Sequence, residues 1–399
     1  MFLQLITATL AGASLGIITG LIPGIHVNLI SIILLSLSSL LLNLASPLTI
    51  ATVIISMAVT HSFLDSIPSI YLGAPDSDMS VSVLPGHKML LEGKGHQAVL
   101  LTVIGSLLAL ILSIIISPLL FVAIKNLYPF LNNIIAYLLI IIVLYMLLKD
   151  KNRLFNIFIF LTSGILGLIV LNIFSLKSPL FPLLSGLFGT STLILSLTQN
   201  SSLPLQSIKQ EVDINKTTIT KAITGSTLAG SLTSLFPGLG PAQGAVLATQ
   251  IVRNIGDKGF LILVGGINTV NFVMSLLTLH LLSKTRNGAV VVVKQLVEIL
   301  NINKLVLLIT VALITGGLAT LLAINISKIF SKLITKVNYR TLCISIIILI
   351  AGTVTAISGI EGILVLIIAT AVGLLAPLLN VARNHSMGCL LLPVILFLV

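Results

Sequence analysis

Charged residues are scarce in this chain of 399 residues. They account for 8% of the chain, whereas a typical soluble domain carries about 25%, and Asp and Glu together number only 10. Hydrophobic residues make up 57%. This balance excludes an ordinary soluble domain and predicts an integral membrane protein.

Cysteine and strand-like patterns are also rare. The two cysteines, Cys343 and Cys389, both lie in apolar segments, which is typical of buried packing residues and gives no disulfide framework or metal site. The alternating pattern of membrane strands is missing, which argues against a barrel. Apolar runs of about 20 residues recur instead, and a helix of that length crosses about 30 Å of hydrocarbon. We therefore expect an all-α polytopic protein of the cell membrane.

The motifs of common catalytic sites are missing as well. The chain has no Walker loop, nucleophile elbow, His-Glu-x-x-His pair or glycine-rich dinucleotide turn in a plausible context. This argues against a membrane enzyme and against a pump driven by ATP. No cofactor is expected, apart from a coupling proton or sodium ion.

The formal net charge of +11 comes from Lys and Arg residues in short loops between the apolar runs. That placement is typical of the positive-inside rule of membrane topology. Attraction of an anionic substrate is a second, weaker interpretation. Nucleic acid is not an expected partner, whereas membrane lipid is.

Two Pro-Gly breaks interrupt apolar stretches rich in small residues. The first is Pro23-Gly24, and the second lies within Phe236–Pro241, which reads Phe-Pro-Gly-Leu-Gly-Pro. Proline removes a backbone donor and glycine permits unusual backbone shapes, so one helix should end and another begin at each break. At membrane depth such breaks are tolerated only where protein or a water-filled cavity satisfies the freed backbone groups. Matched breaks in two halves are typical of a transporter's binding site.

The positions of the breaks predict two homologous halves. Residues 16–25 align with residues 230–239, and the polar segment 198–221 lies between them. We expect a first transmembrane repeat at 1–197, a linker at 198–221 and a second repeat at 222–399. If each half crosses the membrane an odd number of times, the repeats are inverted, and the broken helices could be re-entrant.

Polar residues beside the breaks are candidates for anion binding. Helix N-termini expose N–H groups and a partial positive charge, which favour an anion. The alternatives are that the breaks merely kink packed helices and that the asparagines bond neighbouring helices. The predicted substrate-binding set is Pro23, Gly24, His26, Asn28, Pro237, Gly238, Gly240, Gln243, Asn268 and Asn271.

Asp65 is a carboxylate inside an apolar span, and His61 lies four residues earlier on the same helix face. Burying such a charge in a membrane costs about 2.5–3.5 kcal/mol or more, so a functional role is the first hypothesis. We expect the pair to carry a coupling proton or sodium ion. The alternative is that Asp65 pairs locally near a helix end and orders the turn. A metal site is disfavoured, because no further His or Cys stands at ligand spacing.

An ordered set of motifs resembles the TctA family, the large permease subunit of tripartite tricarboxylate transporters, and more closely its archaeal stand-alone relatives. Pro237–Pro241 matches the Pro-Gly-Leu-Gly-Pro break of that family. Ser66–Leu72 is similar to its Ser-Ile-Pro-Ala-Ile-Leu-Leu segment. Pro85–Met89, followed by Glu92–Gly95, looks like its Asp-Gly-Tyr-Pro-Met stretch and Lys-Gly turn, with Pro85 in place of the Asp. The resemblance implies a transporter architecture.

These observations predict a secondary transporter that moves a small organic anion, such as a di- or tricarboxylate, driven by a proton or sodium gradient. The alternative is a translocase, or flippase, for a polyprenyl phosphate or another phosphorylated lipid carrier, because a helix N-terminus suits phosphate as well as carboxylate. The sequence leaves a homodimer open.

Overall fold

The protein is helical throughout the part of the chain that its computed structural model describes, with no strand in that part. The described residues are 2–23, 25–74, 79–149, 152–173, 175–198, 204–208, 212–236, 239–285, 287–336 and 338–399. Gly24, Pro237 and Gly238, three of the predicted binding residues, lie outside these ranges.

Apolar runs form the long helices, as the composition predicts. Within the described ranges, 8 helices are long and apolar enough to cross a membrane. The long elements are α1 (Phe2–Leu21), α4 (Pro47–Leu64), α7 (Gly95–Lys149), α8 (Arg153–Leu171), α11 (Lys216–Leu235), α13 (Gly256–Leu282), α15 (Ile302–Ile334) and α16 (Tyr339–Leu378). Each of these except α11 forms, contains or is part of a candidate span, and the eighth candidate span is Leu180–Thr198. This confirms a polytopic, all-α membrane protein.

Short elements connect or flank these helices. They are α2 (Val27–Ser36), α3 (Ser38–Leu41), α5 (Ser66–Tyr71), η1 (Ser80–Ser82), α6 (Val83–Leu91), α9 (Leu180–Leu184), η2 (Ser185–Thr190), α10 (Ser191–Thr198), α12 (Pro241–Ile251), α14 (Gly288–Val297), η3 (Arg383–Met387) and α17 (Gly388–Leu398). Together, α9, the π-helical η2 and α10 make one continuous apolar segment, and it is one of the candidate spans.

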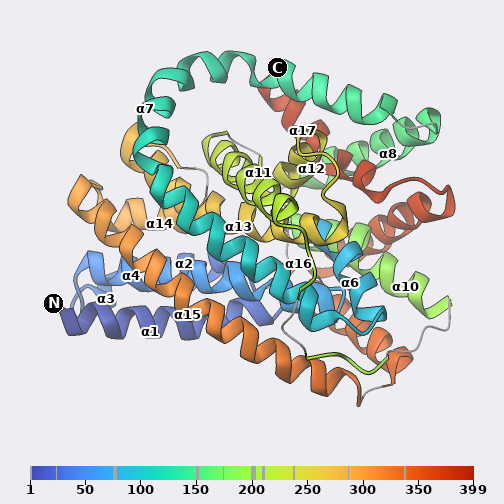
Figure 1. Ribbon diagram of the computed structural model, residues 1–399, viewed down its shortest axis with the longest axis horizontal. Helices are drawn as coiled ribbons and strands as arrows, with labels where there is room; N and C mark the ends of the chain where they lie inside the picture. Colours follow the sequence, from blue (N-terminus) through green and yellow to red (C-terminus); the bar gives the residue numbers. More distant parts are fainter. Residues whose placement is uncertain are drawn as a thin grey trace.

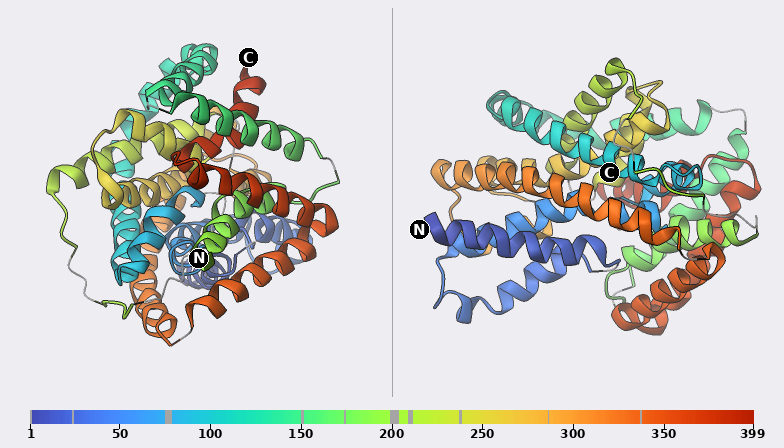
Figure 2. Two further views of the ribbon diagram at one scale, coloured as in Figure 1. Left: turned by 90° about the vertical axis from the view of Figure 1, so that its right-hand side faces the viewer. Right: turned by 60° about the horizontal axis from the view of Figure 1, so that its bottom comes forward.

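The helices pack in two groups. In the first, α4 packs against α1 and α15, while α13 packs against α7 and α11 (Figure 1). In the second, α8 packs against α17, and α16 packs against η2 and α10. The right-hand view of Figure 2 places the N-terminus at one end of the molecule and α16, in orange-red, near the other.

The central helix is α13, and small residues let α7 approach it closely. A Cβ atom at Gly105 would lie 2.0 Å from the Ile262 carbonyl oxygen, and one at Gly265 would lie 2.3 Å from the Thr102 carbonyl oxygen. Ser106 Oγ also donates to the Gly265 carbonyl at 3.0 Å. Without a solvent-driven hydrophobic effect in lipid, close backbone packing and such hydrogen bonds hold helices together. The side chains of α13 are therefore fixed at the centre of the protein.

Helices end and restart at both breaks, as the sequence predicts. α1 ends at Leu21 and α2 begins at Val27, while α11 ends at Leu235 and α12 begins at Pro241. α16 contains a further break, at Gly359. Gly359 adopts φ 65° and ψ −159° there, a backbone shape that glycine tolerates best.

The polar segment between residues 198 and 221 is only partly a connector. Its last part belongs to α11, which begins at Lys216. The side chain of Gln206 bonds the turn between α6 and α7: it accepts from the Gly95 N–H at 3.0 Å and donates to the Leu90 carbonyl at 2.9 Å. The segment is thereby fixed to the first half of the chain.

Candidate functional site

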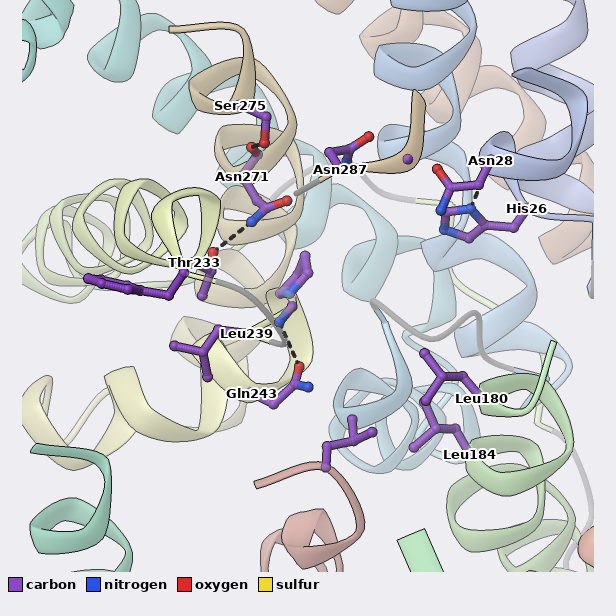
Figure 3. A pocket seen from close by; sticks show the side chains of 15 residues that line it. His26, Asn28, Leu180, Leu184, Thr233, Leu239, Gln243, Asn271, Ser275 and Asn287 are labelled. Carbon is purple, nitrogen blue, oxygen red and sulfur yellow. Dashed lines mark hydrogen bonds between the residues drawn. The ribbon is translucent and has the colours of Figure 1, made fainter. Parts of the chain in front are cut away.

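A cavity of about 240 Å³, which we call the central cavity, lies where both broken regions meet. Five of the predicted binding residues line it: His26, Asn28, Gly240, Gln243 and Asn271. Figure 3 shows His26 and Asn28 on one side of it and Thr233, Leu239 and Gln243 across from them. The folded chain thus brings together residues that are more than half its length apart.

Two helix N-termini at this cavity belong to the predicted breaks. His26 is the N-cap of α2, and its Nδ1 accepts from the Asn28 N–H at 3.1 Å. Gly240 is the N-cap of α12, and its N–H donates to Gln243 Oε1 at 3.1 Å. Each helix start carries about half a positive charge from its aligned peptide dipoles.

A third N-terminus at the cavity was not predicted. Asn287 is the N-cap of α14, and its Oδ1 accepts from the N–H groups of Ala289 at 3.0 Å and Val290 at 3.4 Å. Gly288 follows and lines the cavity, close against the side chain of Asn28. The available signal was an Asn directly before an apolar run, which is a standard start of a helix.

Among the described residues at the cavity, the backbone at the three helix starts supplies partial positive charge. None of the described residues that line it is Lys, Arg, Asp or Glu. Polar side chains complete the wall: Asn271 Nδ2 donates to Thr233 Oγ1 at 2.8 Å, and Ser275 Oγ donates to the Asn271 carbonyl at 2.7 Å. An anion fits this arrangement, because three helix starts favour negative charge and the polar side chains can bond it.

The predicted coupling pair lies beside the cavity and is connected to it through His26. The rings of His26 and His61 meet edge to face, with centroids 5.1 Å apart. His61 Nε2 lies 3.9 Å from Asp65 Oδ2. Asn268 Nδ2 donates to the same Oδ2 at 2.6 Å. The order from the cavity inward is thus His26, His61, Asp65 and Asn268.

Asp65 has a long-range partner as well as a local one. It lies at the junction of α4 and α5 and is 1% exposed, and Asn268 reaches it from α13. A purely local role in ordering the turn would not require that contact. Two of the predicted binding residues, Asn268 and Pro23, are not among the described residues that line the cavity. Asn268 contacts Asp65 instead, and Pro23 is buried. No three His, Cys, Asp or Glu side chains gather as a metal site in the described ranges.

The 8 candidate spans in the described ranges are those of a multi-pass membrane protein. A model of the Tripartite tricarboxylate transporter TctA family matches residues 6–388, so the chain belongs to that family. It is also similar to the uncharacterized protein MJ1079 of Methanocaldococcus jannaschii, with 30% identity over 397 residues and 97% of each chain covered. No solved structure matches the chain.

Proposed function

We propose that this permease is a secondary transporter for a small organic anion, such as a di- or tricarboxylate, and that the anion binds in the central cavity. The observation that carries the proposal is the meeting of three helix N-termini, those of α2, α12 and α14, at one cavity. Membership of a tricarboxylate transporter family supports it.

The size of the cavity suits a compact substrate. Pockets for drug-sized molecules have volumes of about 300–1,000 Å³. The central cavity, at about 240 Å³, is smaller than that range. Each helix start contributes about 0.3–1 kcal/mol toward an anion at an exposed site and up to about 2 kcal/mol when partly buried. Three such ends give a site that holds an anion and still releases it.

The row from His26 to Asn268 supplies a route for coupling. An anion in the cavity favours the protonated form of the neighbouring His26, and a proton on His26 or His61 favours the anion. Coupling of this kind is reciprocal, so the ion gradient can drive accumulation of the substrate. The Asp65 carboxylate, with the Asn268 amide beside it, offers oxygen ligands that also suit sodium.

Mirrored contacts support the proposed repeats, 1–197 and 222–399, on either side of the 198–221 segment. α1 packs against α4 as α11 packs against α13. A Cβ at Gly167 of α8 would lie 1.9 Å from the Cys389 carbonyl oxygen in α17, and one at Gly373 of α16 would lie 2.3 Å from the Leu187 carbonyl oxygen in η2. A pseudo-two-fold axis that relates α8 to the second part of α16, and α17 to the segment around η2, would explain this match.

Uptake into liposomes tests the proposed function. The purified protein is reconstituted, and uptake of labelled citrate and malate is measured with an imposed pH gradient, a sodium gradient or neither. We expect one gradient to drive accumulation of a carboxylate above its equilibrium level. Absence of uptake for the carboxylates tested, in protein that remains folded, would contradict the proposal.

One observation favours the alternative, translocation of a phosphorylated lipid carrier. An apolar cavity of about 410 Å³ lies between α7, α11 and α12, and it shares Thr233, Phe236 and Leu239 with the central cavity. A ligand with an anionic head and an apolar chain would fill both cavities. Binding to the folded state raises the unfolding temperature, so a thermal-shift comparison of citrate, inorganic phosphate and polyprenyl phosphate separates the two functions.

A further inference from the structure

A second cavity, of about 580 Å³ and with charged side chains in its wall, lies along α12. Its lining residues include Lys88, Phe188, Val246, Asp257, Phe260, Arg383 and Asn384. We call it the Arg383 cavity. No sequence pattern predicts a buried cation here, because Arg383 follows the last long apolar run, where an arginine is typical of an exposed loop.

Arg383 is buried without a carboxylate partner in the described part of the chain. Arg383 is 7% exposed. Its Nη1 donates to Ser191 Oγ at 3.2 Å and to Thr192 Oγ1 at 2.6 Å, and both acceptors are neutral. Buried charges are normally paired, because removing them from water is costly. A guanidinium has five N–H donors, so two hydroxyl acceptors leave most of its donors for another group.

The other charges at the cavity cancel one another. Lys88 Nζ lies 2.8 Å from Asp257 Oδ2, and their side chains are 65% and 52% exposed. This hydrogen bond with Asp257 raises the pKa of Lys88. The pair stands at the exposed rim, whereas Arg383 lies deep. The charge that remains uncompensated among the described lining residues is therefore positive and sits in the interior.

The central cavity and the Arg383 cavity are lined by residues within one turn of each other on α12. Gln243 lines the central cavity, and Val246, three residues later, lines the Arg383 cavity. The segment around η2 also borders both cavities: Leu184 lines the central cavity and Phe188 lines the Arg383 cavity. The Arg383 cavity therefore offers an anion a place one short step from the central cavity.

We propose that the Arg383 cavity is a second anion site, in which Arg383 binds an oxyanion, a carboxylate or a phosphate, with the amide of Asn384 beside it. The ligand class rests on the proposed function, because a transported carboxylate would pass through this site before or after the central cavity. A lipid headgroup phosphate would supply the same chemistry.

The absence of tryptophan from the chain allows a direct test. Phe260 lines the Arg383 cavity, so Phe260→Trp places the single tryptophan of the protein there. Its fluorescence is quenched with iodide, an anion, and with neutral acrylamide, in full-length protein in phosphatidylcholine nanodiscs. Arg383→Gln is compared with Arg340→Gln, which removes an exposed arginine at the start of α16.

We expect Arg383→Gln to lower the iodide quenching constant several-fold and to leave acrylamide quenching unchanged, whereas Arg340→Gln changes neither. Citrate or inorganic phosphate should protect the tryptophan from iodide, with an affinity that falls roughly tenfold in Arg383→Gln because a charged hydrogen-bond donor is lost. If Arg383→Gln does not fold, the Phe260→Trp protein with Arg383 intact still tests the site, because citrate or inorganic phosphate must protect its tryptophan from iodide.

Equal iodide quenching in the two arginine variants would overturn the proposal, and so would failure of both citrate and phosphate to compete. Nanodiscs that contain phosphatidylglycerol identify the source of the ligand. If the Arg383-dependent quenching is lost there, a lipid headgroup fills the site; if it persists and citrate removes it, the ligand is a soluble anion. Iodide quenching needs no transport, so a failure of the uptake assay would not affect this result.

Discussion

A negative charge placed at the third helix N-terminus tests the central cavity most sharply. Asn287→Asp keeps the size of the side chain and its role as N-cap of α14, but adds one negative charge to the cavity wall. Asp and Asn are about equally good N-caps, and the charge gains about 0.3–1 kcal/mol from the helix dipole. The unfolding temperature should therefore stay the same or rise slightly.

Asn287→Asp should strongly weaken anion binding, although it does not weaken folding. A sphere with the volume of the central cavity, about 240 Å³, has a radius of about 4 Å, and two unit charges at that distance repel by about 4 kcal/mol at an effective dielectric constant of about 20. That energy corresponds to about a thousandfold loss of affinity. If water and counterions halve it, the loss is still about thirtyfold.

Asn338→Asp is a matched control. Asn338 caps α16 with the same pattern of bonds, accepting from the N–H groups of Arg340 at 2.9 Å and Thr341 at 3.4 Å, but it is exposed and does not line the cavity. Citrate affinity is measured from the thermal shift of each variant, and uptake is measured in liposomes. Equal citrate affinity in Asn287→Asp and Asn338→Asp would refute the placement of the anion among the helix N-termini.

Three further predictions follow from the described contacts. Asp65→Asn should abolish uphill transport while citrate still binds, as measured by gradient-driven uptake and thermal shift; normal accumulation would leave Asp65 a structural role. Gly265→Ala should destabilise the protein by about 1–3 kcal/mol, because the added methyl group overpacks against α7. Gly317→Ala is the control: a Cβ there would have nothing within 4 Å, so the unfolding temperature should not fall, and equal unfolding temperatures for the two variants would contradict the prediction. Cysteines introduced at Asn152 and Asn215 should label from the same side in intact cells, because two candidate spans separate them, and labelling from opposite sides would show that one of these segments does not cross.

The membrane class, the long helices and the two breaks could be predicted from sequence, because each depends on local composition. Apolar runs fix helix length, and proline with glycine fixes where α1 and α11 end. The boundary between the linker and the second half was harder to predict: the polar segment was placed at 198–221, but α11 begins within it at Lys216. Polar Thr and Lys residues there look like a loop, and only packing against neighbours decides that they are helical.

The candidate site was predictable in part. His61 and Asp65 share a helix face at fixed spacing, so their proximity followed from the sequence alone. The contacts of Asn268 with Asp65 and of His26 with His61 join different helices, and no local pattern encodes them. Asn287 was missed for the same reason, because an N-cap is recognisable in sequence but the cavity that it faces depends on the tertiary fold.

The caps of the three helices have a consequence for an unloaded transporter. In the structure, His26 Nδ1, Gln243 Oε1 and Asn287 Oδ1 already accept hydrogen bonds from backbone donors at these helix starts. On the proposed function, an anion that binds here would exchange with these side-chain acceptors instead of meeting unbonded N–H groups. We expect this exchange to make the net gain from substrate hydrogen bonds small, because each bond to the anion replaces one that the empty protein already has.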